Sequence, residues 1–293
     1  SAPRFEIDPW WPKPLPEGWI TAQLACVCVD HNDHVLIVNR GDITEEEKET
    51  CVRAPAVMIF DRDGNMIGSW GDWDVLPSTP HSCAVDRDNN IWLSANGDGM
   101  VQKYTYDGKL LVQIGTKGVF DTADGGKRGP GANKRTDRLN KPAGIACDPT
   151  NDDVYFADGY GNRRISVTEK DGTVKTLADK YAGKRFNSPN DLTLDGQGRV
   201  YFTDPRYVGG NDRELDAEGV YRVGPDGTVT QIIKDVQKPN GIVLSPDQKT
   251  LYVADSNNDP KGHRVLLAFP FMADGTVGLA KKLHDFGADR GID

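Results

Sequence analysis

Four side chains that can bind a metal or move a proton recur at one position of a repeated pattern. His81, Asn190 and Asn240 lie five residues before the Asp or Ser of a tight turn, and a further interval of 53 residues leads to Asp293. An imidazole nitrogen, amide oxygens and a carboxylate are all metal ligands. The mostly oxygen set favours Ca²⁺, whereas the histidine leaves Zn²⁺ open. The spacing therefore predicts a divalent-metal site, provided that the repeat brings these positions together.

An ordinary structural role is the alternative for these residues. A single histidine in a channel is more often structural than a ligand. Asn190-Asp191 and Asn240-Gly241 are also turn-forming pairs. Polar side chains around a channel can simply hydrogen-bond water. Four donors at one repeat position nevertheless favour a metal site over this interpretation.

The elements that must position these residues are repeated pairs of β-hairpins. Each repeat begins with an apolar run, a turn with Asp or Ser, and a second alternating run, as in HSCAVDRDNNIWLSAN and NGIVLSPDQKTLYVADS. A second pair of runs follows, joined in five cases by an Asp-Gly turn. Two hairpins make a four-stranded unit, and radial packing of such units is typical of a β-propeller. The sequence therefore predicts an all-β chain of four-stranded blades.

The repeat positions give the number of blades. Alignment of the turns makes five positions equivalent, at intervals of 56, 62, 47 and 50 residues: Ala25, His81, Ala143, Asn190 and Asn240. Blades are predicted to begin near residues 24, 80, 142, 189 and 239, and a sixth at 291. We expect residues 1–293 to form a single propeller domain of the six-bladed type, with five complete blades and a truncated sixth that exposes a sheet edge. A five-bladed ring is the alternative.

The composition limits the partners of the chain. It has 35 basic and 44 acidic residues, and the net charge of −9 argues against a nucleic-acid partner and suits a cation or an uncharged small molecule better. The dense aromatic segment at Trp10-Trp11 is broken by prolines and too short to cross a bilayer, so no integral membrane segment is predicted. The start Ser1-Ala2-Pro3 is compatible with a processed, secreted or periplasmic product, and a cytoplasmic location stays open.

The five cysteines favour buried free thiols. Cys26 and Cys28 are two residues apart on an expected strand, so they share one face. The cysteines show no metal-binding CxxC spacing, and cysteine packs as a small apolar residue. One disulfide involving Cys51 is the alternative in an oxidising compartment.

Residues 185–293 resemble a family of six-bladed calcium lactonases, the senescence-marker/gluconolactonase/luciferin-regenerating family. The matching phrases are FNSPNDLTLDGQGRVYFTDPRY, EGVYRVGPDGT, KPNGIVLSPDQKTLYVADS and the terminal Gly-Ile-Asp. The resemblance implies that Asn240 and Asp293 are metal ligands, that Asp293 is also the general base, and that Asn190 contacts metal or substrate. The family's glutamate ligand in the first blade falls at Ala25, which departs from the pattern.

Residues 5–165 look more like NHL-repeat propellers, especially the peptidyl-hydroxyglycine amidating lyase. The matching phrases are PHSCAVDRDNNIW, FADGYGNRRI and VNRGD. This resemblance implies that His81 is a zinc ligand and that Arg40 and Tyr160 are catalytic. The lyase's other zinc histidines fall at Asn190 and Asp293, so a three-histidine zinc site is absent. Arg40 and Tyr160 also lie at strand ends, where such side chains are ordinary.

The leading hypothesis is a metal-dependent hydrolase of lactones or related cyclic esters. The cation is expected to be held by Asn190, Asn240 and Asp293 with help from His81, and to activate the substrate carbonyl and a bound water. Asp293 would accept the proton, Arg40 or Tyr160 would stabilise the oxyanion, and Asn190 and His81 would contact the small-molecule substrate. The alternatives are a zinc lyase acting on a hydroxyglycine-type substrate through Arg40, Tyr160 and His81, and a non-catalytic NHL-type propeller that binds a protein partner.

Overall fold

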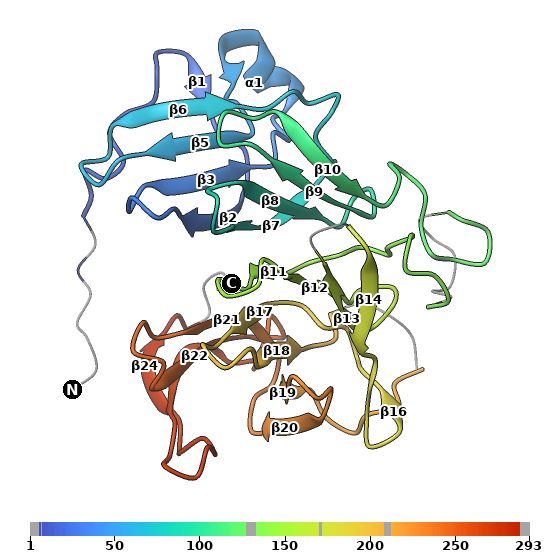
Figure 1. Ribbon diagram of the computed structural model, residues 1–293. Coiled ribbons are helices and arrows are strands. Elements are labelled where there is room, and N and C mark those ends of the chain that lie inside the picture. The colour runs from blue at the N-terminus through green and yellow to red at the C-terminus, as the bar shows by residue number, and fades with distance from the viewer. Residues whose placement is uncertain (1–5, 7, 127–132, 170–171, 208–211, 288–293) are drawn as a thin grey trace.

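The computed structural model describes residues 6, 8–126, 133–169, 172–207 and 212–287, and it contains five four-stranded antiparallel sheets arranged around an axis (Figure 1). The first sheet contains β2 (Leu24–Val29), β3 (Val35–Asn39), β5 (Val57–Phe60) and β6 (Met66–Trp70). The second contains β7 (Pro80–Val85), β8 (Ile91–Ala95), β9 (Met100–Tyr104) and β10 (Leu110–Ile114). The third contains β11 (Ile145–Cys147), β12 (Val154–Asp158), β13 (Arg164–Thr168) and β14 (Val174–Ala178).

The last two sheets have the same order. The fourth contains β17 (Leu192–Leu194), β18 (Val200–Asp204), β19 (Gly219–Val223) and β20 (Val229–Ile233). The fifth contains β21 (Pro239–Leu244), β22 (Thr250–Ser256), β23 (Arg264–Pro270) and β24 (Lys281–Asp285). In each sheet the first strand lies nearest the centre in Figure 1, so the predicted all-β propeller with blades of two hairpins is confirmed for the described residues.

A few short elements lie outside the four-stranded sheets. They are α1 (Glu45–Thr50), β1 (Trp19–Ile20) paired in parallel with β4 (Val52–Arg53), and β15 (Lys180–Tyr181) paired with β16 (Lys184–Arg185). Thr44 begins α1 with a reciprocal capping box to Glu47. In the described part of the chain, no helix has the length and apolar character needed to span a membrane.

The repeated turn residues close the inner hairpins through their side chains. The Asp30 carboxylate accepts the backbone N–H of His34 at 2.8 Å, and Asp86 accepts that of Asn90 at 2.9 Å. In the fifth blade the Ser245 hydroxyl accepts the N–H of Thr250 at 2.9 Å. This bond fixes the start of the second strand in these blades, whereas in the third blade Asp148 accepts the N–H of Thr150 within the turn at 2.7 Å.

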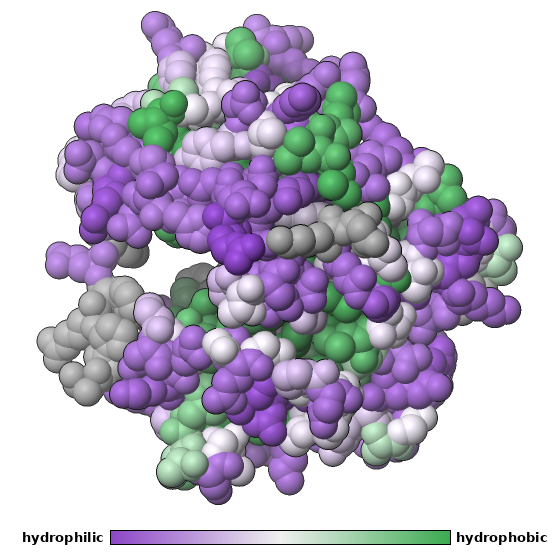
Figure 2. Space-filling model, viewed as in Figure 1, coloured by the Kyte–Doolittle hydropathy of each residue, from purple (hydrophilic) through white to green (hydrophobic). Residues whose placement is uncertain are grey.

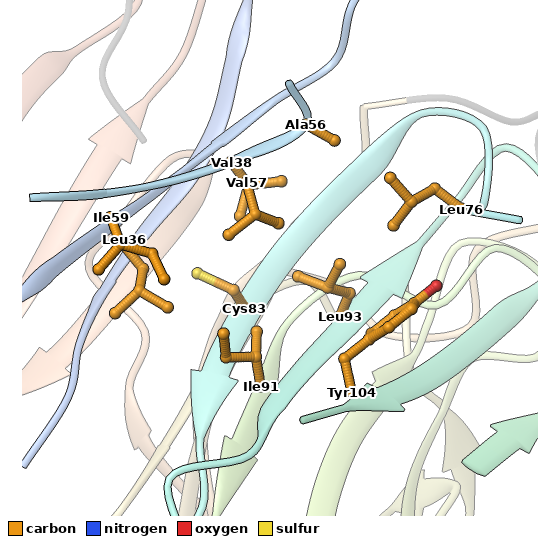
Figure 3. Packing of buried hydrophobic residues seen from close by; sticks show 10 residues of the cluster. All are labelled: Leu36, Val38, Ala56, Val57, Ile59, Leu76, Cys83, Ile91, Leu93 and Tyr104. Atoms are coloured by element: carbon orange, nitrogen blue, oxygen red, sulfur yellow. The ribbon is translucent and has the colours of Figure 1, made fainter. Parts of the chain in front are cut away.

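Each interface between consecutive blades is held by an apolar residue three positions before the turn residue. These residues are Cys83, Ile145, Leu192 and Ile242, with exposed fractions of 7%, 4%, 4% and 6%. Each packs into a cluster that includes residues of the preceding blade. Figure 3 shows Cys83 of β7 facing Leu36 and Val38 of the first blade. Burial of these side chains stabilises the contact between blades.

The first and fifth blades present faces that no neighbouring blade covers among the described residues. Val27 is the first-blade equivalent of Cys83, and it is 64% exposed. Val243 lies on the opposite face of the fifth blade and is 55% exposed. Figure 2 shows an open gap between the two blades at the left of the view. A sixth blade is not among the described residues, and its predicted start, including Asp293, lies outside them.

The predicted free sheet edge belongs to the truncated sixth blade, whose start lies outside the described residues. Within the described residues, the uncovered surfaces include sheet faces on β2 and β21. Neighbouring blades of a propeller meet face to face through side chains, so a missing neighbour exposes a face.

Candidate functional site

Side chains from four blades meet where the innermost strands begin. The Tyr160 hydroxyl donates to Asn190 Oδ1 at 3.2 Å and lies 3.5 Å from His81 Nε2. Asn190 Nδ2 in turn donates to Asn240 Oδ1. The rings of His81 and Tyr160 meet edge to face, with centroids 5.8 Å apart. These four residues, which are up to 159 positions apart in sequence, therefore form one chain of contacts at a single mouth of the ring. We call this set the mouth chain.

Two glycines place Tyr160 in the mouth chain. A Cβ on Gly159 would lie 1.6 Å from the carbonyl oxygen of Pro189, and one on Gly161 would lie 1.9 Å from the Asn140 side chain. Only glycine permits such close approach. The third-blade loop can therefore pack directly on the residue before Asn190, and this brings the Tyr160 hydroxyl within reach of the Asn190 amide.

In three blades, a buried aspartate in the second strand binds the backbone segment that leads into an innermost strand. Asp204, at the end of β18, accepts the N–H groups of Asn187 at 2.9 Å and Ser188 at 2.7 Å, just before Asn190. Asp255 of β22 accepts the N–H of Lys238 at 2.7 Å, just before Asn240. Asp158 of β12 plays the same part by accepting the N–H of Asn140 at 2.7 Å.

Sequence reasoning missed these aspartates. Their signal was the repeated ending of the second strand in FAD, FTD and VAD, which terminates at Asp158, Asp204 and Asp255. Burial is the main cause that raises the pKa of Asp158 and Asp204, the latter to about 7, with the Glu218 charge adding to the rise at Asp204. By accepting these backbone N–H groups, the aspartates position the segments that lead into the innermost strands.

His81 is neutral at physiological pH. Burial, together with the positive charge of Arg40, lowers the pKa of His81 to about 4. Its Nδ1 atom is buried and has no hydrogen-bond partner among the described residues. A neutral imidazole with a free ring nitrogen can accept a hydrogen bond or ligate a cation.

Arg40 approaches His81 from the first blade. Its Nε donates to the carbonyl oxygen of Pro80 at 3.1 Å, and its Nη1 donates to Gln23 Oε1 at 2.7 Å. Because Pro80 directly precedes His81, these bonds fix the guanidinium beside the mouth chain.

A cavity of about 820 Å³ opens beside these residues and is lined by the innermost strands of the blades. Val27 and Val243, on the two uncovered blade faces, also line it, so this volume includes part of the gap between the first and fifth blades. Its lining is largely apolar and also includes Arg40, His81, Asp191 and Asn240. Four of the five cysteines line it as well, namely Cys26, Cys28, Cys83 and Cys147. All five cysteines are free, as the sequence predicted, but only Cys83 is buried and the other four are partly exposed.

The described residues supply neutral metal donors but no carboxylate aimed at the mouth chain. Asn190 Oδ1 accepts from Tyr160, and Asn240 Oδ1 accepts from Asn190. The Asp191 carboxylate accepts the N–H groups of Leu192 and Ile242. Within the described ranges, no three His, Cys, Asp or Glu side chains converge as a metal site. A hard cation therefore fits these donors only with an added carboxylate, and Asp293, the predicted one, lies outside the described residues.

The sequence-predicted residues thus have different outcomes. His81, Asn190, Asn240 and Tyr160 lie together, and Arg40 is tied to the residue before His81. Ala25 lines the cavity without a donor group, in keeping with the expected loss of the first-blade ligand. The chemical roles assigned to these residues remain predictions.

Comparisons with known proteins agree with the resemblance to gluconolactonases and with the resemblance to NHL-repeat propellers. A gluconolactonase of Zymomonas mobilis is 32% identical over 179 residues, which cover 59% of this chain and 47% of the relative. NHL repeat-containing protein 3 of Mus musculus is 29% identical and covers 94% of this chain and 72% of the relative. The chain thus spans about half the length of the gluconolactonase that it matches.

Solved structures of a gluconolactonase and of a lyase are also similar to this chain. A gluconolactonase structure from Xanthomonas campestris superposes with a TM-score of 0.54 at 25% identity, over 70% of this chain and 62% of the other. A streptogramin B lyase gives a TM-score of 0.59 at 14% identity, over 88% and 68%, and this likeness concerns the fold alone. The model of the SMP-30/gluconolactonase/LRE-like region matches residues 129–293, more than half of the sequence, and the chain therefore belongs to this family.

Proposed function

We propose that the protein is a metal-dependent hydrolase of lactones or related cyclic esters. The observation that carries the proposal is the mouth chain, which gathers His81, Tyr160, Asn190 and Asn240 beside a cavity at the centre of the blades. Family membership and lactonase relatives support the same reaction class.

Each of these side chains would have a different role in ester hydrolysis. Asn190, Asn240 and Asp293 would hold a divalent cation, preferably Ca²⁺, with His81 as a further donor. When bound, this cation supplies charge that polarises an ester carbonyl and lowers the pKa of water. The Asp293 carboxylate would take the proton of the attacking water. The Tyr160 hydroxyl is a neutral donor that already bonds an oxygen in the mouth chain, so it would donate to the developing oxyanion.

The test is a panel of aldonolactones and homoserine lactones, assayed by pH-stat with the full-length protein before and after chelation. We expect turnover that falls by at least about tenfold on chelation and returns with added Ca²⁺. Asn240→Ala should remove most of the activity, while the exposed turn variant Asn32→Ala serves as a matched control. Absent or chelator-insensitive turnover would rule the proposal out.

A lyase acting on a hydroxyglycine-type substrate is the second candidate. The lyase resemblance implies roles for Arg40, Tyr160 and His81. The Tyr160 hydroxyl lies 3.5 Å from His81 Nε2, and Arg40 donates to the carbonyl oxygen of Pro80, the residue before His81. This proximity favours the lyase as a candidate. Elemental analysis separates the two candidates. Stoichiometric zinc supports the lyase, whereas calcium without zinc supports the lactonase. A non-catalytic binding propeller is left if His81→Ala and Asn240→Ala change no activity.

We also propose that a sixth sheet closes the ring between β21 and β2. It would cover Val27 and Val243, whose equivalents in the other blades are buried or half-buried at blade interfaces. In the full-length protein, Val27→Ala should then lower the free energy of unfolding by about as much as the interface variant Ile145→Ala, roughly 2–3 kcal/mol. A cost near zero for Val27→Ala beside a full cost for Ile145→Ala would refute closure.

A further inference from the structure

Three thiols lie together where the first blade packs against the second. Cys26 and Cys28 are two residues apart on β2, so their side chains share one face of the strand. Cys83 of β7 enters the same interface from the second blade (Figure 3), and both first-blade thiols pack against the apolar cluster that contains it. All three are free thiols. The interface therefore places one second-blade sulfur beside two sulfurs of the first blade.

The cavity gives small molecules a route to these thiols. Cys26 and Cys28 are partly exposed, Cys83 is only 7% exposed, and all three line the cavity. A small polar oxidant that enters the cavity therefore meets the first-blade thiols before it meets Cys83. Within the described part of the chain, these sulfurs do not join other ligands in a metal site of three or more groups. Reaction between the thiols is the chemistry that their positions favour.

Burial protects Cys83 from reagents in solution but not from a sulfur beside it. Burial is the main cause that raises the pKa of the Cys83 thiol, and the neighbouring Cys26 and Cys28 thiols add to the rise. Little thiolate therefore forms at neutral pH, and attack on a dissolved reagent is slow. Reaction with an adjacent sulfur is intramolecular, and its high effective concentration compensates for the small thiolate fraction. Cys83 is thus suited to the second, resolving step of disulfide formation.

We propose that hydrogen peroxide drives a reversible disulfide between Cys83 and either Cys26 or Cys28, which joins the first two blades covalently. In the first step a β2 thiolate attacks a peroxide oxygen. An S–O bond forms, the O–O bond breaks, and the departing hydroxide takes up the proton that the thiol released. In the second step the Cys83 sulfur attacks the sulfenic sulfur, so that an S–S bond forms, the S–O bond breaks and the oxygen leaves as water. Two thiols are oxidised, and one peroxide is reduced to two waters.

The bond would lie near the mouth chain, but it does not depend on the proposed hydrolysis. His81 is two residues before Cys83 on β7, and Arg40 directly follows β3, the strand that pairs with β2. A link between β2 and β7 would therefore hold the blade that carries Arg40 against the blade that carries His81. Because the linked cysteines are far apart in sequence, the bond would also restrict the unfolded chain.

Peptide mapping of the oxidised protein tests the proposal. The native full-length protein would be treated with hydrogen peroxide, blocked with N-ethylmaleimide before denaturation, and digested without reductant. Trypsin leaves Cys26 and Cys28 in one peptide and places Cys51, Cys83 and Cys147 in three separate ones. We expect two of the five thiols to be lost and the Cys83 peptide to be joined to the peptide that holds both β2 cysteines. Dithiothreitol should separate the two peptides and restore both thiols.

Matched variants complete the test. Cys83→Ala and the double variant Cys26→Ser/Cys28→Ser should each abolish the joined peptide, whereas Cys51→Ser should leave it unchanged. Retention of all five thiols, conversion to sulfinic acid alone, a bond only between Cys26 and Cys28, or bonds only to Cys51 or Cys147 would overturn the proposal. Persistence of the joined peptide mass in Cys83→Ala would do the same. Should Cys83→Ala fail to fold, the peptide map of the wild type and the double variant decide.

Discussion

Replacement of Asp204 by Asn should flatten the dependence of stability on pH. Asp204 is fully buried, and burial, with help from the Glu218 charge, raises its pKa from 3.8 to about 7, against the opposing effect of the Asn187 and Ser188 N–H groups. Between pH 4 and pH 7 the unfolded chain has lost this proton while the folded chain keeps it. The folded state therefore binds more protons, and stability falls as pH rises through this window.

The size of the effect follows from the shift. A rise of about three pKa units corresponds to on the order of 4 kcal/mol between the two ends of the window. Asp204→Asn removes this titration, although its amide will repel one of the backbone N–H donors and lower stability at every pH by about 1–3 kcal/mol. The prediction therefore concerns the difference in unfolding free energy between pH 4.5 and pH 8, in which a constant cost cancels.

Urea unfolding at these two pH values measures that difference. The wild type should lose several kcal/mol more than Asp204→Asn between pH 4.5 and pH 8, and the exposed turn variant Asp107→Asn should behave as the wild type. If Asp204→Asn and the wild type have the same pH dependence, Asp204 is not a protonated anchor of the segment that carries Asn190, and this part of the reasoning is refuted.

Three further predictions concern the mouth chain and the cysteines. Gly159→Ala should cost at least about 3 kcal/mol in unfolding free energy, because its Cβ would overlap the Pro189 carbonyl oxygen, whereas Gly126→Ala should cost under about 1 kcal/mol; equal costs would contradict the close approach. Tyr160→Phe should lower kcat by roughly 100-fold with a smaller change in KM and a stability loss near 1 kcal/mol, and an unchanged kcat would remove Tyr160 from the reaction. Iodoacetamide at pH 8 should label Cys51 at least about tenfold faster than Cys83, because burial raises the pKa of the Cys83 thiol. Peptide mass spectrometry measures the order of labelling, and a faster reaction at Cys83 would contradict the prediction.

The repeat pattern was sufficient to predict the blades and part of the site. Residues at a fixed distance from the turn necessarily lie at equivalent points of successive innermost strands, and this is why His81, Asn190 and Asn240 could be grouped from spacing alone. Tyr160 is different, because it follows a second strand. Its place depends on how closely Gly159 approaches Pro189, and no periodicity records that approach.

Other features depend on burial and charge that only the folded chain creates. The low pKa of His81 requires the tertiary environment and the nearness of Arg40. The exposed face at Val27 could not be recognised from sequence, because the same apolar position is buried in the other four blades. The anchoring aspartates were visible as a repeated strand ending, yet their function became clear only when Asp204 and Asp255 were found bonded to the chain before Asn190 and Asn240.

The most direct test of the central claim is an anomalous difference map from a crystal of the full-length protein soaked with Ca²⁺ or Zn²⁺. A reaction centre at the mouth chain predicts one dominant peak in contact with Asn190, Asn240 and the carboxylate of Asp293, with His81 beside it. A metal bound only elsewhere, or none at this mouth at saturating concentration, would contradict the account.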